Sequence, residues 1–374
     1  MAESALDYVT VKGFKSIASI EKLALGPINV LIGANGSGKS NFIEVFAFLH
    51  SMREGHLQDY VRRGGGADQL LHFGSKSTKQ IELKISFGAE VNRYQVVLRP
   101  DQNDSLYPAD ERVYYWDKTK YGSPYEEVLL SRESGLEAGI SDPTAQRIPN
   151  WVRHRLGLWR IYHVHDTSAS SPMRKTAQVN DNRFLRSNGS NLPAFLYLLR
   201  RKHRSQYDLI VRTIQRVAPF FDDFQLEPDR LNEATIRLAW KHKNSDLYFG
   251  SSSLSDGTLR FIVLATLFLQ PEGFLPSVIL VDEPELGLHP YAITLLASLV
   301  RQASAKTQVI LSTQSAWLLD HFEPQEVLVA ERVESSTSIK RLDPKPLAQW
   351  LDEYSLGQLW EKNEIGGRPG ARRD

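Results

Sequence analysis

Apolar and polar residues alternate with two different periods along the chain, which predicts strands and helices in a recurring order. Residues 8–14 (YVTVKGF) and 28–33 (INVLIG) are short apolar runs, typical of strands. Residues 41–52 (NFIEVFAFLHSM) carry apolar side chains at helical spacing. Residues 81–98 alternate apolar and polar side chains on both sides of a short turn, which predicts a β-hairpin. Strand, loop and helix therefore follow one another near the N-terminus.

The second half of the chain returns to this alternation after sequence of a different character. Residues 99–150 are rich in Pro, Gly, Asp and Tyr, and we interpret them as inserted sequence with short strands. A helix is predicted over 192–221, with a break near Ser205. From residue 234 onward the pattern predicts strands, a helix over 258–269, a strand over 278–281, a helix over 290–303, a strand over 308–313 and a mixed tail.

Strands that alternate with helices at both ends of the chain predict one α/β core with a mostly parallel sheet. Residues 1–80 and 236–374 are expected to form the N-terminal and C-terminal parts of this core. Residues 81–235 are expected to form an insertion, with β-hairpins as an antiparallel β subdomain and a basic helical lid.

Composition limits the possible classes of protein. The 374 residues are 41% hydrophobic and 24% charged, which is ordinary for a globular protein. There are no cysteines, which excludes disulfides, thiolate metal sites and a cysteine nucleophile. The longest apolar run, 261–269, is about half a membrane span, and no signal peptide is recognisable. We therefore expect a soluble cytoplasmic protein without a membrane partner.

A glycine-rich loop follows the second predicted strand. GANGSGKS (33–40) fits the P-loop pattern, and it lies between an apolar strand and an amphipathic helix. Backbone N–H groups of such a loop cradle phosphates, Lys39 adds a positive charge, and the Ser40 hydroxyl can ligate magnesium. By chance, about one chain in a hundred of this length would carry the pattern, and the strand–loop–helix context lowers that frequency. The residues expected to contact ATP from this loop are Gly33, Asn35, Gly36, Ser37, Gly38, Lys39, Ser40 and Asn41.

A second apolar strand ends in two acidic residues, within SVILVDEPELGLHP (277–290). A carboxylate at a strand end can hold the Mg²⁺ of a P-loop protein, which predicts this role for Asp282 together with Ser40. Glu283 could reach an attacking water as general base. The alternative is a strand that ends in a solvated acidic turn, since DEP is also a turn signal.

Three further stretches carry a resemblance to a known superfamily. LSDGT (254–258) resembles the signature sequence of ABC-type ATPases, and it stands shortly before the acidic strand as in that superfamily. GLHP (287–290) looks like the dimer-contact loop of these ATPases, and VKGFKSI (11–17) resembles the first strand of the SMC and RecF branch. The resemblance implies an ABC-ATPase-like head of the P-loop NTPase fold.

The number of residues between the P-loop and the signature, and after Gln314, narrows the resemblance to one group. About 210 residues without sustained heptads separate P-loop and signature, too few for a long-armed SMC protein, and about 60 residues follow Gln314, too few for the Toprim domain of OLD proteins. The chain is most similar to compact stand-alone bacterial ATPases with an SMC/RecF/OLD-like head. Members of that group are often encoded beside a separate effector and implicated in anti-phage defence or DNA maintenance. The resemblance thus implies an effector partner, for which a nuclease is one candidate.

The resemblance also implies a mechanism. In such heads two subunits sandwich ATP, so that Ser255 and Gly257 would contact the γ-phosphate bound by the other subunit of a homodimer. A nucleotide-contacting glutamine is expected between P-loop and signature, and Gln69 is a candidate, although the glycines beside it can simply form a turn. Gln314 occupies the place of a switch residue that is commonly histidine. Lys39, Glu283 and Gln314 form the expected catalytic set, and the alternative for Gln314 is that it merely ends a strand.

Positive charge is concentrated in one part of the chain. Residues 151–216 hold 13 Lys and Arg against three Asp, while the whole chain has a net charge of only +1. This predicts a phosphate-backbone surface for DNA whose densest part is the cluster Arg200, Arg201, Lys202 and Arg204, and a solvated helix face is an equally good interpretation. The YHVHD stretch has metal-binding spacing, but a lone cluster is more often structural, and only Mg²⁺ is predicted.

Three functions are compared. The leading one is an ATP-hydrolysing, dimerising switch that acts with an effector in nucleic-acid transactions. A scaffold that binds ATP with little hydrolysis is the second, and Glu283 argues against it. The motor subunit of a membrane transporter is the third, and the SMC/RecF-like N-terminus and the basic stretch argue against it.

Overall fold

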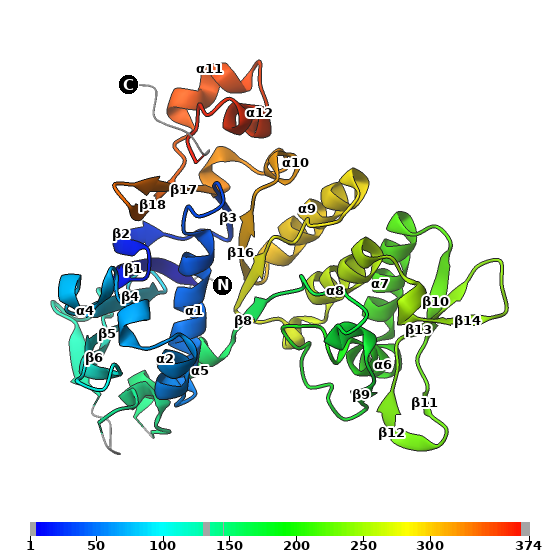
Figure 1. The fold of residues 1–374 in the computed structure, drawn as a ribbon, viewed down its shortest axis with the longest axis horizontal. Coiled ribbons are helices and arrows are strands. Elements are labelled where there is room, and N and C mark those ends of the chain that lie inside the picture. Colours follow the sequence, from blue (N-terminus) through cyan, green and yellow to red (C-terminus); the bar gives the residue numbers. More distant parts are fainter. Residues whose placement is uncertain (1–4, 130–134, 145, 368–374) are drawn as a thin grey trace. The chain divides into compact units, whose positions relative to one another are not determined.

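The computed structural model describes residues 5–129, 135–144 and 146–367 (Figure 1). The chain forms two compact units. Unit 1 comprises Met1–Trp159 and Phe322–Asp374, and unit 2 comprises Arg160–His321. The three-part division by sequence character, with boundaries after residues 80 and 235, remains a prediction.

Unit 1 contains an antiparallel sheet with the strand order β2-β1-β4-β5-β6-β7. Its strands are β1 (Leu6–Phe14), β2 (Ile17–Ala24), β4 (Ile81–Phe87), β5 (Asn92–Pro100), β6 (Leu106–Tyr115) and β7 (Tyr125–Val128). The predicted strand at 8–14 and the predicted hairpin at 81–98 are confirmed. Because β4 pairs with β1, the sequence boundary after residue 80 falls inside one sheet.

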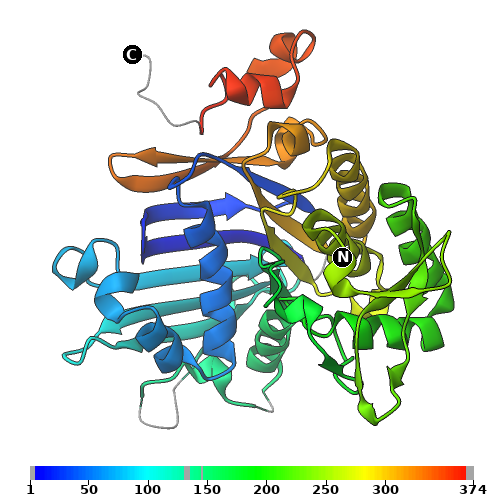
Figure 2. The ribbon, with the colours of Figure 1, turned by 45° about the vertical axis from the view of Figure 1, so that its right-hand side comes forward.

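Helix α1 (Lys39–Arg53) lies over one face of this sheet, as Figure 2 shows. The apolar positions that predicted the helix, Phe42, Val45, Phe46 and Leu49, are all fully buried. Phe48 of the same helix stacks on Phe14 of β1 with ring centroids 5.5 Å apart. The remaining helices of unit 1 are α2 (Leu57–Arg63), α3 (Ala67–Leu70), α4 (Gly74–Ser77), α5 (Arg147–Gly157), α11 (Ala348–Leu351) and α12 (Leu356–Glu361).

A second group of strands in unit 1 carries the P-loop. Strand β3 (Ile28–Ile32) is buried along its whole length, as expected for a strand with both faces covered. It pairs in parallel with β17 (Val327–Val333), which pairs antiparallel with β18 (Ser336–Arg341). The glycine-rich loop therefore leaves the carboxyl end of a buried parallel strand, the place where α/β proteins position ligands.

Unit 2 has its own parallel pair, β15 (Val278–Asp282) and β16 (Gln308–Thr313), joined through α9 (Pro290–Ser304). Asp282 lies opposite Ser312 in the register of these strands. Helix α8 (Asp256–Leu269) precedes β15, and nearly all of its residues are buried. The helices and strands predicted from 258 to 313 are confirmed, with boundaries that differ by at most two residues.

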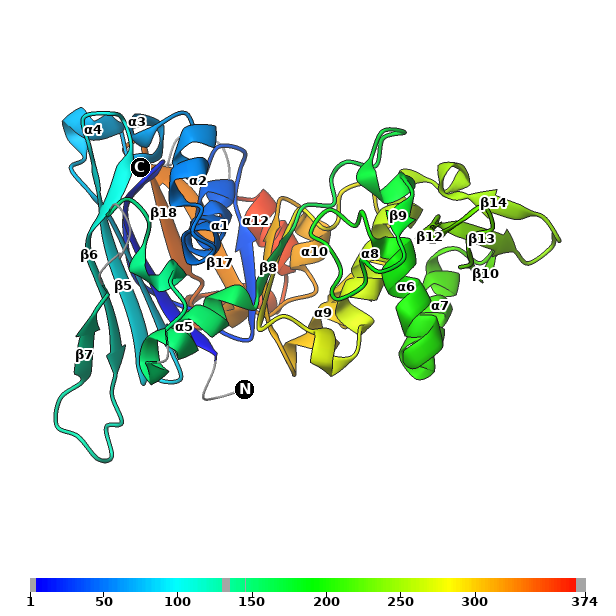
Figure 3. The ribbon, with the colours of Figure 1, turned by 90° about the horizontal axis from the view of Figure 1, so that it is seen from below.

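Small sheets and further helices make up the rest of the described part of unit 2. Helices α6 (Leu192–Lys202) and α7 (Arg204–Val217) accompany α8 in Figure 3. The break predicted near Ser205 lies at His203. The sheets have the orders β10-β13-β14 and β11-β12-β9. Their strands are β9 (Ala177–Gln178), β10 (Phe221–Gln225), β11 (Pro228–Asp229), β12 (Asn232–Ile236), β13 (Ala239–His242) and β14 (Tyr248–Gly250); β8 is Trp159–Tyr162 and α10 is Ala316–Leu319.

Within the ranges that the structure describes, no helix has both the length and the apolar character that crossing a bilayer requires.

Candidate nucleotide-binding site

The P-loop of unit 1 depends on glycine at three positions. Gly36 and Gly38 have φ angles of +77° and +101°, which side-chain-bearing residues rarely adopt. A Cβ on Gly33 would lie 2.4 Å from the carbonyl oxygen of Ala330, and one on Gly38 would lie 1.9 Å from Oγ1 of Thr337. The loop is therefore closely packed against β17 and β18, and only glycine fits at these positions.

The Lys39 side chain folds back over the loop. Its Nζ donates hydrogen bonds to the carbonyl oxygens of Gly33, at 2.7 Å, and Ala34, at 2.9 Å, and the residue is buried. Oγ of Ser37 is buried as well and has no hydrogen-bond partner. A buried ammonium and an unsatisfied hydroxyl in one glycine-rich turn form a polar cradle, and their chemistry fits the phosphates of a nucleotide.

Most of the other predicted residues of the loop are exposed to solvent, and one forms a hydrogen bond within the fold. Asn35, Gly36 and Ser40 are exposed. Nδ2 of Asn41 donates to Oγ of Ser16 at 2.6 Å, and this hydroxyl in turn lies 2.7 Å from Oγ1 of Thr337. Asn41 thus ties the start of α1 to the turn between β1 and β2.

A pocket of about 610 Å³ lies beside this turn and includes the predicted Gln69 in its lining. Its volume is in the range of small-molecule sites. His72 is fixed there because Nδ1 lies 2.7 Å from the carbonyl oxygen of Lys15 and Nε2 lies 3.2 Å from Oγ of Ser336. The polar lining also includes Lys15, Ser16, Asp68, Arg332 and Ser335. Apart from Gln69, sequence reasoning did not assign these side chains to a site, because their spacing along the chain carries no motif.

In unit 2 the predicted general base and the predicted switch residue are in direct contact. The Gln314 amide donates through Nε2 to Oε1 of Glu283. The backbone N–H of Glu283 donates to the carbonyl oxygen of Ser312 at 2.7 Å, and Glu283 has a φ of +43°, an unusual conformation for a side-chain-bearing residue. The unusual backbone conformation of Glu283 thus directs its carboxylate toward the side chain of Gln314.

Glu285 is a partly exposed residue with a buried carboxylate oxygen, and the sequence analysis missed it. Its Oε1 accepts hydrogen bonds from Oγ1 of Thr313 and from the backbone N–H of Gln314, the latter at 3.3 Å, while Oε2 has no partner. Burial raises the pKa of Glu285 above its ordinary value near 4.5, and the neighbouring Glu283 adds to this rise. The only signal in the sequence was a second glutamate two residues after the first in DEPE.

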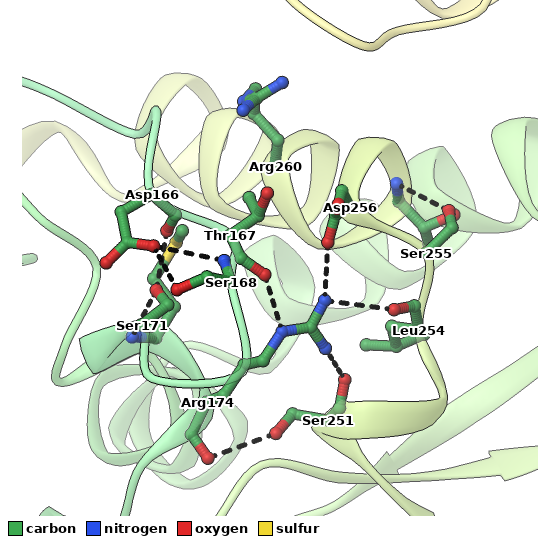
Figure 4. Close-up of polar contacts among 12 residues, drawn as sticks. Asp166, Thr167, Ser168, Ser171, Arg174, Ser251, Leu254, Ser255, Asp256 and Arg260 are labelled. Atoms are coloured by element: carbon green, nitrogen blue, oxygen red, sulfur yellow. Dashed lines mark hydrogen bonds and ion pairs between the residues drawn. The ribbon is translucent and has the colours of Figure 1, made fainter.

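The signature stretch is held in place by an arginine (Figure 4). Arg174 donates from Nε to the carbonyl oxygen of Thr167 at 2.9 Å and from Nη2 to that of Leu254 at 3.2 Å. It also donates to the carbonyl oxygen of Ser251 and forms an ion pair with Asp256. This role could not be predicted from the sequence, because Arg174 stands about 80 residues before the signature and belongs to no motif.

The signature serine and glycine have distinct positions. Oγ of Ser255 accepts a hydrogen bond from the backbone N–H of Thr258 at 3.2 Å and caps α8. A Cβ on Gly257 would lie 2.3 Å from the carbonyl oxygen of Gly287, in the predicted dimer-contact loop. Signature and contact loop therefore touch backbone to backbone.

The predicted site residues are divided between the two units. The P-loop and Gln69 belong to unit 1, whereas Asp282, Glu283, Gln314 and the signature belong to unit 2. The predicted basic cluster lies at the junction of α6 and α7. Arg204 pairs with Asp208, and Nη1 of Arg201 donates to Oη of Tyr197 at 2.6 Å. Arg201, Lys202 and Arg204 are exposed.

A comparison with family models identifies the chain. The model described as "AAA domain, putative AbiEii toxin, Type IV TA system" matches residues 28–320. The chain belongs to this AAA-domain family. The match runs from strand β3 through the P-loop, signature and acidic strand to Gln314, so it includes every predicted ATP-site motif. The resemblance to ABC-type SMC/RecF-like ATPases is confirmed.

Curated relatives of this AAA-domain protein are similar over short segments. The chain is 31% identical to the chromosome partition protein Smc of Mycolicibacterium paratuberculosis over 106 residues, which are 28% of the chain and 8% of Smc. It is 30% identical to the DNA double-strand break repair Rad50 ATPase of Saccharolobus solfataricus over 80 residues, 21% of the chain and 9% of Rad50. For the DNA replication and repair protein RecF of Lacticaseibacillus casei, identity is 29% over 106 residues, 27% of the chain and 29% of RecF. Each match thus covers less than a third of the relative.

Solved structures match the AAA-domain chain over nearly its whole length. An Smc head bound to the C-winged helix domain of ScpA has a TM-score of 0.61 at 15% identity, covering 92% of this chain and 99% of that one. An Smc head with an extended coiled coil, bound to the C-terminal domain of ScpA derived from Pyrococcus furiosus, has a TM-score of 0.53 at 16% identity, covering 93% and 99%. The predicted fold class, an α/β P-loop NTPase with an ABC-ATPase-like head, is confirmed.

We predict that Gly257→Ala destabilises the AAA-domain protein by about 1–3 kcal/mol, the usual range for overpacking. The new methyl group would meet the Gly287 carbonyl, and this clash outweighs the higher helix propensity of alanine. Urea unfolding of both proteins measures the change. Gly273→Ala is the matched control, because a Cβ there meets no atom within 4 Å. Equal unfolding midpoints for the Gly257 variant and the wild type would contradict the close packing.

We predict that Glu285→Gln raises the melting temperature, and that this gain grows as the pH rises above about 4.5. The raised pKa means that the folded protein holds this proton more tightly than the unfolded chain, so wild-type stability falls as pH rises toward the folded pKa. Glutamine cannot ionise and avoids this loss. Thermal melting between pH 4 and 8 tests it, with the exposed Glu233→Gln as control. A pH-independent difference would count against a buried, ionisable Glu285.

Proposed function

We propose that this protein is an ATP-hydrolysing head that dimerises around Mg²⁺–ATP and serves as a switch for a separate effector in nucleic-acid transactions. The observation that carries the proposal is the contact between Gln314 and Glu283 at the carboxyl end of a parallel pair of strands. A carboxylate oriented by an amide at such an edge is suited to accept a proton from water. The P-loop of unit 1 supplies the complementary feature, a built cradle for phosphate.

The nucleotide would be held by the residues that the sequence predicts. Backbone N–H groups of the P-loop and the Lys39 ammonium would bind the phosphates, and the Lys39 contacts to its own loop keep the ammonium in position until then. The exposed Ser40 hydroxyl and the Asp282 carboxylate have the oxygen donors that Mg²⁺ prefers. Bound Mg²⁺ would offset the charge of the phosphates.

Gln314 has a more specific proposed role than a sensor of phosphate. Its Nε2 donates to Glu283, so the amide fixes the rotamer of the base through a hydrogen bond that persists across the pH range in which histidine would titrate. Glu283 keeps a second carboxylate oxygen with which to accept a proton. We therefore assign Glu283 as the base and Gln314 as its positioning residue.

Dimerisation would bring the signature of one subunit to the nucleotide of the other. Ser255 lies at the N-terminus of the 14-residue helix α8, where backbone N–H groups favour an anion. Arg174 holds the preceding loop by its carbonyl groups, so that this surface is preorganised. Leu286 and Tyr291, on either side of the contact loop, are large exposed apolar side chains that a second copy could cover.

The names of the relatives support a role in nucleic-acid transactions with an effector. Smc, Rad50 and RecF are named for chromosome partition, double-strand break repair, and replication and repair. The family description refers to an AbiEii toxin of a type IV toxin–antitoxin system. We propose anti-phage defence or DNA repair as the setting, with an effector that reads the nucleotide-dependent state of the dimer.

We predict that Glu283→Gln slows ATP hydrolysis by about 10²–10⁴-fold, the range for loss of a general base, while ATP still binds. Gln314→Ala should lower kcat with little change in KM, because it removes the hydrogen bond that orients the base and leaves the P-loop residues unchanged. Lys39→Ala is the contrasting variant and should weaken ATP binding itself. Phosphate release and calorimetry measure both properties. Wild-type turnover no faster than that of Glu283→Gln would favour an ATP-binding scaffold instead.

A second proposed activity is binding of the DNA backbone at the α6–α7 junction. Arg201 and Lys202 are exposed at the end of α6, in the part of the chain with the largest excess of positive charge. Arg204 offers less charge to DNA because it pairs with Asp208. Arg200 is also engaged within the fold, since its Nη1 lies 3.4 Å from the carbonyl oxygen of Phe224. The proposal therefore rests mainly on Arg201 and Lys202.

We predict that DNA affinity falls steeply with salt, and that changing Arg201 and Lys202 together to Ala lowers the salt slope by about 2, since each phosphate contact contributes about 0.9. Fluorescence anisotropy with labelled DNA at several salt concentrations measures the slope. Lys306→Ala is the control, an exposed cation of the same unit that pairs with Glu272. A wild-type affinity that does not change with salt would remove the proposed DNA surface.

A further inference from the structure

Three metal-ligating side chains of unit 2 converge at the end of β15. His163, His165 and Asp282 each offer a ligand atom, and these atoms all lie within 4.8 Å of one another. Nε2 of His165 lies 3.9 Å from Oδ2 of Asp282. The sequence showed the two histidines beside Asp166, but about 120 residues separate them from the carboxylate that completes the group.

The two imidazoles come from one short segment of chain. His163 and His165 directly follow β8 with one residue between them, and each places a ligand atom within 4.8 Å of the Asp282 carboxylate. Val164 between them is buried, so the two histidines are turned away from the core. Asp166 is engaged elsewhere, since its carboxylate accepts hydrogen bonds from the backbone N–H and Oγ of Ser168, at 3.1 and 2.6 Å.

The loop that carries the histidines is held by a buried arginine. Arg260 of α8 donates from Nε to the carbonyl oxygen of Val164 at 2.9 Å and from Nη2 to that of His165 at 3.0 Å. Asp282 is fixed independently as the last residue of β15. Ligands on rigid, separately supported elements keep their spacing without a bound ion, which reduces the cost of binding one.

The spacing and exposure of the group suit an open metal site. Ligand atoms about 2.0–2.2 Å from an ion can be at most about 4.4 Å apart, so small side-chain rotations bring all three atoms within reach of one ion. His163 is exposed, and the His165 and Asp282 side chains are 35% and 17% exposed. Three protein ligands with access to solvent leave further coordination positions for water or a substrate oxygen.

We propose that His163, His165 and Asp282 bind a divalent transition-metal ion, with Zn²⁺ as the best match to two imidazoles and one carboxylate. Imidazole nitrogen favours Zn²⁺ and similar ions, whereas Mg²⁺ prefers oxygen ligands and retains its water. The site requires no nucleotide. Asp282 is also the proposed Mg²⁺ ligand, so an ion held by the histidines would share a carboxylate with the proposed ATP site.

The experiment is calorimetric titration of the full chain with Zn²⁺, after treatment with chelator, without nucleotide and in excess Mg²⁺. We expect one Zn²⁺ per chain in the wild type, because Mg²⁺ competes poorly for imidazole. His163→Ala and His165→Ala should each weaken binding by at least about tenfold, since even outer-shell changes at metal sites cost 10–100-fold. His154→Ala, which removes an exposed histidine of unit 1, should bind as the wild type does.

Co²⁺ provides a second measurement that reports the ligand geometry directly. Wild-type protein should show visible absorption bands of Co²⁺ bound by nitrogen and oxygen ligands, and His163→Ala, which changes an exposed side chain, should lose them. Failure of the wild type to take up Zn²⁺ in excess Mg²⁺, or equal uptake by the histidine variants, would overturn the site. Because no nucleotide is present, neither outcome depends on the proposed ATPase activity.

Discussion

One backbone hydrogen bond fixes the geometry of the acidic turn in unit 2. It runs from the N–H of Glu283 to the carbonyl oxygen of Ser312. This bond stands at the end of the parallel pairing of β15 and β16, where Asp282 lies opposite Ser312. Glu283 thereby turns with a positive φ, and its carboxylate meets the amide of Gln314. Because parallel strands end at the same edge of a sheet, residues about 30 positions apart in the sequence form one polar cluster.

Two arginines, of which Arg260 is buried, support the loops around this cluster. Arg174 binds the carbonyl groups that precede the signature, and Arg260 binds those of the loop with His163 and His165. Burial lowers the pKa of Arg260 below its usual value, which is the cost of removing a guanidinium from water. The carbonyl groups offset that cost, and a fork of several donors positions irregular backbone more firmly than a single hydrogen bond would.

Backbone contacts at glycines serve the same purpose where side chains would not fit. Gly38 lies against Thr337 in unit 1, and Gly257 lies against the carbonyl of Gly287 in unit 2. In both places a glycine-containing motif is packed on a segment distant in sequence. The motif glycines therefore have two functions, since they permit the loop conformation and also allow the neighbouring backbone to approach.

The sequence by itself determined the elements and the local motifs. The P-loop, the acidic strand and the signature are each contiguous, and their chemistry follows from backbone geometry within a few residues. Only the tertiary structure decided which distant residues join them. The pair Gln314 and Glu283 is separated by 31 positions in the sequence, and the pair Asp282 and His165 by 117. Arg174 stands about 80 positions before the signature that it holds. Apolar periodicity carries no information on such pairs. The burial of Glu285 was hidden for the same reason, because the environment of a side chain is set by the strands and helices that pack around it.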